Sequence, residues 1–215
     1  MAERRTSMAN CKLPEDLIEQ AKAFHGHWCS GLAIGIRIAE AALDTVGHNG
    51  DEEIFCVSEC DHCAVDAIQF LTGCTIGKGN LRIENVGKTA FRFYRRLDKK
   101  AVRISKLNAI KYPNEAKMQE LRDKYALGAL SEEEKALYAA LRKEKSDQIL
   151  KSDLAALVKI EDIPFESFPR ALMTDSVTCA LCGESTMETK TRLLGGKVLC
   201  IPCFEKLAKE ATSYY

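Results

Sequence analysis

The chain has 215 residues, 46% of them hydrophobic and 29% charged, with 31 basic against 31 acidic side chains. This length and composition are those of a folded soluble protein with one medium-sized domain and a small module, and the balanced charge disfavours a dedicated binder of nucleic acid or of an anionic membrane. The sequence has no apolar run long enough to span a membrane and no apolar signal-peptide core over residues 1–12, so we expect a cytoplasmic protein.

The first two predicted helices flank a short polar stretch. Residues 14–24 place apolar side chains at helical spacing after a proline, and residues 32–46 form a helix that is apolar nearly all round and should be buried. Ser30 is the expected N-cap of the second helix. Polar residues directly before a buried helix require an explanation.

That stretch carries His25, His27 and Cys29 at alternating positions. In an extended or turning backbone, alternating side chains point to one side. Imidazole and thiolate are good ligands for zinc, iron, nickel and copper, so the triplet is a candidate transition-metal site. Cys29 also precedes a helix, where a thiol ionises more easily, so a reactive thiol without a metal is the second interpretation.

A second group of candidate ligands lies at the start of a third predicted helix. A short strand is expected over 53–57, and Asp61 is the expected N-cap of the helix that follows. Cys63 and Asp66 are three residues apart on this helix and so share a face. The two groups could meet in one pocket, with Cys29, Cys63 and Asp66 as catalytic candidates, although a purely structural role for Cys63 and Asp66 fits equally well.

Four nearby residues have simpler explanations. A buried cysteine usually acts as a small hydrophobic residue, which is our interpretation of Cys56 and Cys11. Cys60 and His62 are expected at the surface.

The next segment predicts a glycine-rich turn followed by the strands of a sheet. Gly77-Lys78-Gly79 could hold an anion through its amides and its lysine, but its spacing is not that of a P-loop and a plain turn fits as well. The basic side chains from Arg92 to Lys111 fit a solvated strand face better than a nucleic-acid surface. Strands are expected over 81–85, 89–94 and 101–104.

Two more helices and a linker are predicted before the last cysteines. Amphipathic helices are expected over 115–127 and 132–150, and a capping box opens the second. Residues 161–175 contain two prolines and few periodic apolar positions, which indicates a linker.

Cys179, Cys182, Cys200 and Cys203 form two CxxC pairs with the spacing of a four-cysteine zinc site. Residues 193–199 between them predict a strand, a Gly-Gly turn and a strand, and the last cysteine opens a helix, as in a treble clef. Two redox dithiols are the alternative, but redox CxxC motifs usually belong to a βαβ unit and seldom occur paired at this spacing. We therefore expect a structural zinc ion.

Together these elements predict an α+β fold. A mixed β-sheet flanked by helices is followed by a small four-cysteine treble-clef zinc domain. The expected boundaries are 1–160 for the core domain with the His/Cys cluster, 161–175 for the linker and 176–215 for the zinc-binding domain.

Several stretches of the chain resemble the E-subunit family of formylmethanofuran dehydrogenase. They are FHGHWCSG at 24–31, CAVDAIQFLTGCTIGKGN at 63–80, GKTAFRFY at 87–94, and CALCGE and GGKVLCIPCF around the last four cysteines. The resemblance implies an α+β domain with a mixed sheet, followed in many members by a treble-clef zinc module. Some members accompany a molybdenum or tungsten formylmethanofuran dehydrogenase, which reduces carbon dioxide onto a C1 carrier. Carried over by position, it implies an N-terminal site made of His25, His27, Cys29, Cys63 and Asp66, with Lys78 nearby as a further catalytic candidate.

These observations predict a metal-binding enzyme or enzyme subunit of C1 or related metabolism, resembling a subunit of a molybdenum or tungsten oxidoreductase. Zinc is expected at the C-terminal site, and a second transition metal, zinc or another, at the N-terminal cluster. The alternative is a non-catalytic metal-binding protein that docks partners through its zinc module. We also expect a homodimer, because the buried second helix and the helices over 114–150 carry more apolar surface than one small sheet can cover. Other oxidoreductase subunits are expected partners; nucleic acid and membranes are not.

Overall fold

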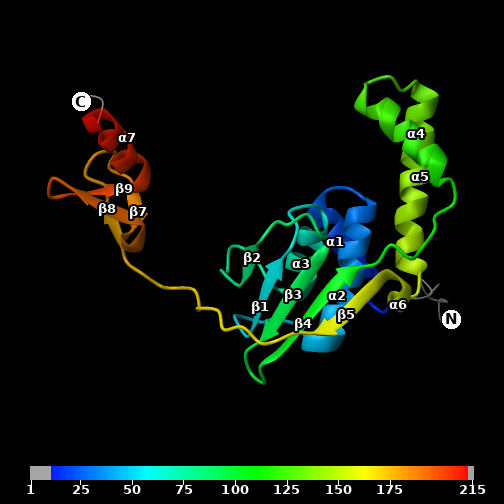
Figure 1. The fold of residues 1–215 in the computed structure, drawn as a ribbon, viewed down its shortest axis with the longest axis horizontal. Coiled ribbons are helices and arrows are strands. Elements are labelled where there is room, and N and C mark those ends of the chain that lie inside the picture. The colour runs from blue at the N-terminus through cyan, green and yellow to red at the C-terminus, as the bar shows by residue number, and fades with distance from the viewer. Residues whose placement is uncertain (1–10, 213–215) are drawn as a thin grey trace, which may run out of the picture. The chain divides into compact units, whose positions relative to one another are not determined.

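The computed structural model describes residues 11–212, and the chain divides into two compact units, Met1–Arg170 and Ala171–Tyr215. The first unit combines a five-stranded mixed sheet with helices, and the second gathers four cysteines, so the predicted α+β class with a zinc module is confirmed (Figure 1). The first unit contains, in chain order, α1 (Glu15–His25), α2 (Ser30–Val46), β1 (Ile54–Ser58), α3 (Ala64–Thr72), β2 (Leu81–Ile83), β3 (Ala90–Arg95), β4 (Lys100–Lys106), α4 (Glu115–Ala126), α5 (Glu132–Lys151), α6 (Leu154–Leu157) and β5 (Val158–Asp162).

The sheet has the strand order β2-β1-β3-β4-β5. β1 and β2 run parallel and the other neighbours are antiparallel. The register places Arg82 opposite Val57, Val57 opposite Arg92, Arg92 opposite Arg103, and Arg103 opposite Glu161. Because side chains alternate between the faces of a strand, these five residues form one row across one face of the sheet.

Helices α1, α2 and α3 cover the opposite face (Figure 1). α2 is buried along most of its length, as its apolar sequence predicted, and packs on α3, α5 and the sheet. Phe91, Phe93, Val102 and Ile104 face it from the two central strands. The apolar surface of α2, which had suggested a dimer, is therefore covered within one chain.

The segment after β5 lies on the other face of the sheet. Phe168 is buried there and stacks on Phe55, with ring centroids 4.0 Å apart and 5° between the rings. Arg96 donates a hydrogen bond of 2.6 Å to the Phe168 carbonyl. Glu161 and Asp162, expected at the start of the linker, belong to β5. The first part of the expected linker therefore packs on the sheet.

The helix starts differ from the predicted caps in two places. Cys29, rather than Ser30, is the N-cap of α2, and its sulfur accepts the amide of Leu32 at 3.3 Å. At α3 the imidazole of His62, rather than Asp61, accepts the Ala64 amide. At α5 the predicted capping box is present.

α4 and α5 form a helical hairpin with a small core of its own. Leu121, Leu130 and Leu141 are buried in it, whereas Tyr125 and Leu127 are exposed. Only the lower part of α5 packs on the sheet domain, mainly against α2. Among the described residues, no helix combines the length and apolar character needed to cross a bilayer.

The second unit consists of two short hairpins and one helix. The predicted Gly-Gly hairpin is present, with both glycines at positive φ, as tight hairpin turns require. The elements are β6 (Ser176–Thr178), β7 (Ser185–Met187), a 3-10 turn (Glu188–Lys190), β8 (Thr191–Leu194), β9 (Lys197–Cys200) and α7 (Ile201–Thr212).

Candidate metal centres

The ligand atoms of His25, His27, Cys29 and Cys63 lie within 4.8 Å of one another. His25 ends α1, Gly26 turns the chain with a φ of 85°, and Cys29 caps α2. Cys63 arrives from the start of α3. The structure thus brings the two predicted ligand groups together at the N-terminal ends of two packed helices.

Two glycines on α2 allow this approach. A Cβ atom on Gly31 would lie 3.0 Å from the Cβ of Cys63, and one on Gly35 would lie 2.7 Å from the backbone of Ala64. Real Cβ atoms essentially never approach within 3.0 Å, so α2 and α3 can pack at this distance only because position 35 lacks a side chain, whereas at Gly31 a Cβ atom would require Cys63 to shift by a few tenths of an ångström. Their contact carries Cys63 to the cluster.

Asp66 orients His25 within this cluster. Its Oδ2 lies 2.7 Å from His25 Nδ1, while His25 Nε2 lies 3.8 Å from the sulfur of Cys29. When Nδ1 donates to the carboxylate, Nε2 is left with a free lone pair directed at the cluster. Asp66 therefore acts on the site through His25, while its own side chain stays partly exposed.

Burial raises the pKa of the Cys63 thiol, and the hydrogen bond with Cys29 raises it further. Without a metal, Cys63 is therefore protonated at neutral pH. A bound metal would displace this proton, since the thiolate is the ligand form.

Trp28 is linked to a distant helix by a contact that no local pattern indicates. Its indole nitrogen donates to Asp147 on α5 at 2.8 Å, and Lys22 lies over its ring at 4.4 Å. This contact joins positions 119 residues apart and ties the loop carrying His27 and Cys29 to α5. The sequence offers one signal that could have indicated this role: Trp28 is the single tryptophan of the chain and lies between two candidate ligands.

Lys78 lies at the other end of α3. The charge of Lys78 acts on Cys74 and Glu53, beyond the helix C-terminus, whereas Cys63 is at its start. Nine helical residues separate the two ends by about 13 Å. The contacts of Lys78 thus give no support to its role as a catalytic candidate, which stays a prediction.

Two predictions for the neighbouring residues have opposite outcomes. His62 is exposed, as expected, and its Nε2 lies 3.0 Å from the Thr89 hydroxyl. Cys60 is buried, so the surface position predicted for it is wrong. Its amide and sulfur both contact the Ser58 hydroxyl, because the chain turns inward directly after β1.

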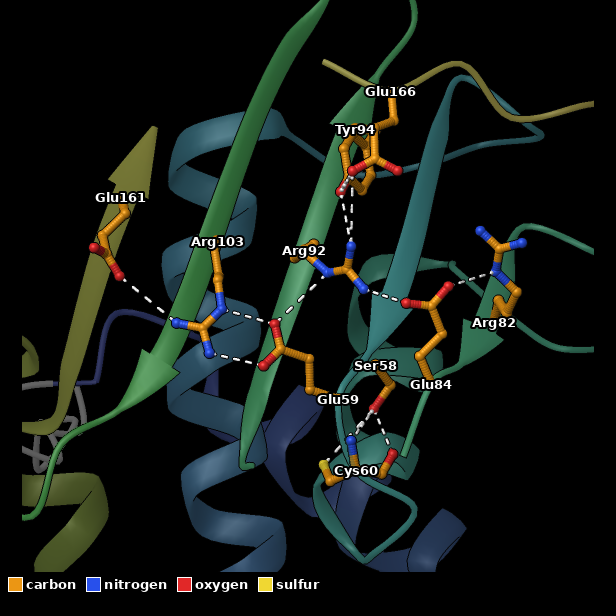
Figure 2. A network of polar contacts seen from close by, with 10 residues as sticks. All are labelled: Ser58, Glu59, Cys60, Arg82, Glu84, Arg92, Tyr94, Arg103, Glu161 and Glu166. Atoms are coloured by element: carbon orange, nitrogen blue, oxygen red, sulfur yellow. Dashed lines mark hydrogen bonds and ion pairs between the residues drawn. The ribbon is translucent and has the colours of Figure 1, made fainter. Parts of the chain in front are cut away.

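The basic strand residues do not form a simple solvated face. Arg103 holds Glu59 through two hydrogen bonds of 2.7 Å, and Arg92 pairs with Glu59 and Glu84 (Figure 2). The hydrogen bonds from Arg103 are the main cause that lowers the pKa of Glu59, and the charges of Arg103 and Arg92 lower it further. The network depends on which strands pair, so the local sequence could not reveal it.

The second centre is formed by Cys179, Cys182, Cys200 and Cys203, whose sulfurs also lie within 4.8 Å of one another. Backbone amides around Cys179 lower the pKa of its thiol to about 6, and the amide of Cys200 donates to its sulfur at 3.3 Å. Four sulfurs in this arrangement match a closed tetrahedral zinc site. The geometry supports the predicted zinc ligands.

Comparisons with known proteins agree with these two centres. Residues 24–159 match the family model described as FmdE, molybdenum formylmethanofuran dehydrogenase operon. Residues 175–207 match the prokaryotic dksA/traR C4-type zinc finger. The first match includes every residue of the N-terminal cluster, and the second includes all four C-terminal cysteines.

Two relatives extend the comparison. A curated protein of Archaeoglobus fulgidus, named "Probable S-adenosyl-L-methionine-binding protein", is 30% identical over 207 residues, which are 93% of this chain. The chain spans about half, 53%, of the length of that relative. A crystal structure of an FmdE-like protein from Syntrophus aciditrophicus, named after tungsten formylmethanofuran dehydrogenase, has the same fold, with a TM-score of 0.51 and 22% identity over 92% of this chain and 96% of that one.

The FmdE model covers more than half of the chain and includes the His/Cys cluster, helices α2 and α3 and strands β1 to β4. The C-terminal unit adds the four-cysteine finger. The chain therefore belongs to the FmdE family, with a C4-type zinc finger after its α+β domain.

Proposed function

We propose that the His25–Cys63 cluster binds a transition metal and that the protein is a metal-dependent enzyme, or a subunit of one, acting in oxidoreductase chemistry of C1 or related metabolism. The observation that supports this most is the convergence of two imidazoles and two sulfurs within 4.8 Å, from segments more than thirty residues apart. Mixed nitrogen and sulfur donors suit zinc, iron, nickel or copper.

The four donors differ in how firmly they are held. Cys29 is buried, its sulfur is fixed by the Leu32 amide, and the side chain of His25 is only 8% exposed and bound to Asp66. His27 is exposed and follows the Gly26 turn. We infer that His25, Cys29 and Cys63 are the firm ligands and that His27 occupies the position that a substrate can take.

A metal bound there would act as a Lewis acid or a redox centre. The residues of the chain would perform the rest. Asp66 would hold the His25 ring in position, and Trp28 would hold the ligand loop against α5. In this proposal Cys29 and Cys63 contribute to catalysis as metal ligands. The alternative is a reactive Cys29 thiol that acts without a metal.

The test is metal content per chain together with cobalt(II) spectra. Wild type should hold one metal at each centre, and Cys29→Ala should lose the N-terminal metal alone. His27→Ala should keep it, with d–d bands that report a changed coordination number. Cys56→Ala, at a buried thiol outside the cluster, serves as the control. Unchanged metal content in Cys29→Ala would refute the proposal.

A non-catalytic role is the second candidate, and the separate zinc module favours it. That unit has few internal apolar contacts, and Leu181 and Leu193 are exposed on it, as on a docking module. If the N-terminal site is structural and not catalytic, His27→Ala would lose the N-terminal metal, because a structural site needs all four ligands.

We also propose a homodimer, or an assembly with other oxidoreductase subunits. The exposed Tyr125, Leu127 and Leu137 of the α4–α5 hairpin support such a contact. Analytical ultracentrifugation at micromolar concentration should give a mass above the 23.9 kDa of one chain. A monomer of both wild type and Leu127→Ser would refute the homodimer.

A further inference from the structure

A shallow cleft of about 440 Å³ lies where β3 begins and β4 ends. Its volume is within the range of small-molecule sites. Its polar lining comes from the GKTAFRFY stretch and from the end of β4. The polar lining residues are Lys88, Thr89, Arg103, Ser105, Lys106 and Asn108. Three of them are cations and none is a carboxylate.

The cleft has an excess of positive charge. Arg103 is neutralised by Glu59, whose carboxylate also feels the charge of Lys88, but within residues 11–212 neither Lys88 nor Lys106 lies within ion-pair distance of a carboxylate. Desolvation lowers the pKa of Lys106, and the charge of Lys145 lowers it further. An anion placed beside Lys106 would offset both effects, because a nearby opposite charge favours the protonated ammonium.

The hydroxyl of Thr89 is oriented as a donor. The Ala64 amide donates to Nδ1 of His62, so the neutral His62 ring carries its proton on Nε2. Nε2 then donates to the Thr89 oxygen at 3.0 Å. With its oxygen accepting this bond, Thr89 can direct its own proton into the cleft.

Asn108 is oriented in the same sense. Its Oδ1 accepts a hydrogen bond of 3.1 Å from Lys106 Nζ, which leaves its amide N–H groups as donors. Lys88, Thr89, Lys106 and Asn108 therefore line the same small volume with groups that can all donate hydrogen bonds. Such a set matches an oxyanion, whose oxygens only accept.

We propose that this cleft binds the phosphate group of a small molecule. Two unpaired lysines match the double charge of a phosphate better than the single charge of a carboxylate. His62, which contacts the cleft wall, is the residue before Cys63, so the bound molecule would extend toward the metal cluster. This last step rests on the proposed function, whereas phosphate binding itself does not.

A nucleic-acid phosphate fits the surroundings less well. On the adjoining sheet face Glu84, Glu161 and Glu166 alternate with the arginines (Figure 2). This interleaving interrupts the continuous cationic path that a nucleic-acid backbone follows. A compact ligand confined to the cleft avoids these carboxylates.

The test is a titration of the full chain with inorganic phosphate at constant ionic strength, followed by amide chemical shifts. Thr89, Lys106 and Asn108 should shift and saturate. Lys88→Gln/Lys106→Gln should weaken binding at least tenfold, and Thr89→Val several-fold. The matched control is Lys99→Gln/Lys100→Gln, which removes the same charge at the opposite end of β4 and should leave the affinity unchanged.

The proposal would be overturned by no saturation in wild type, by equal weakening in the control, or by acetate binding as tightly as phosphate. Tighter binding of a single-stranded oligonucleotide, with shifts spread along β3, would also overturn it in favour of a nucleic-acid surface. Cys29→Ala should still bind phosphate, and the double lysine variant should still bind metal. Failure of phosphate binding can therefore be distinguished from failure of the metal proposal.

Discussion

The two cysteine clusters differ in what holds their ligands in place. In the C-terminal unit the buried core consists of Cys179, Leu199 and Cys200, so two of its three members are themselves metal ligands. A unit of this size cannot assemble a stable core without a metal or disulfides. There the metal takes the place of a hydrophobic core.

In the N-terminal cluster the candidate ligands are positioned by a large hydrophobic core, most of which is made of other residues. α2 and α3 meet at Gly35 and Ala64, and both helices pack into the large apolar cluster over the sheet. Cys29 is a buried member of that cluster and Cys63 packs against it, but most of the cluster consists of aliphatic and aromatic side chains outside the candidate site. The C-terminal cysteines therefore maintain the fold of their unit, whereas the N-terminal cluster is held in place by a fold that other residues maintain.

The largest effect is expected from metal removal. A strong chelator should unfold residues 171–212 and leave the sheet domain folded, because structural zinc contributes on the order of 10 kcal/mol to such modules. Amide hydrogen exchange would show the loss of protection in one unit only. Cys182→Ser should reproduce this loss and Cys29→Ser should not. Cooperative unfolding of both units would contradict the distinction.

The second test disturbs the scaffold of the N-terminal cluster. Gly35→Ala would place a Cβ atom 2.7 Å from the Ala64 backbone and should destabilise the sheet domain by about 3 kcal/mol, although alanine is the better helix former. Thermal unfolding measures the loss. Gly77→Ala, where no atom lies within 4 Å of the new Cβ, should be close to neutral. Equal melting temperatures for Gly35→Ala and Gly77→Ala would show that α2 and α3 can move apart without loss of stability.

Features with a local cause could be predicted from the sequence. The helix over 32–46 follows from an unbroken apolar surface, and the four-cysteine centre from two CxxC pairs at a suitable spacing. The Gly-Gly hairpin follows because two adjacent positions need positive φ. In each case one short segment contains the whole physical reason.

Features that depend on tertiary pairing could not be predicted. Glu59 is bound by Arg103 and Arg92 only because β1, β3 and β4 are adjacent in this register. The N-cap of α2 differs from the predicted one because Cys29 and Ser30 are adjacent at the start of the helix and both side chains can accept an amide. That the Cys29 sulfur does so depends on where the first turn begins.

The third test concerns the stability of the sheet domain apart from any metal. Glu59→Gln replaces a charged partner of Arg103 and should cost about 2 kcal/mol at pH 7. The pKa of Glu59 is lower in the folded state, so its stabilisation is full above the ordinary value of 4.5 and is lost as pH falls through the lowered pKa.

The difference between wild type and Glu59→Gln in urea unfolding should therefore shrink below pH 4.5. Glu161→Gln removes a longer and more exposed contact with the same arginine, 3.6 Å, and should cost clearly less than Glu59→Gln. If the stability difference between wild type and Glu59→Gln instead grew as the pH fell, the lowered pKa of Glu59 in the folded state would be contradicted. Metal content should be the same in both variants.

The smallest effect is expected where the scaffold only tunes a ligand. Asp66→Asn keeps a hydrogen-bond acceptor for His25 Nδ1 but removes the negative charge that makes His25 Nε2 a stronger donor to a metal. Metal affinity at the N-terminal centre should fall about tenfold, whereas the C-terminal centre, whose sulfurs are supported by backbone amides, should be unaffected. Competition with a chromophoric chelator can resolve the two centres because only one responds.

If Asp66→Ala weakens binding no more than Asp66→Asn, then charge alone acts on His25. If neither changes the affinity, His25 is not a ligand, and the N-terminal centre would rest on its two thiols and His27.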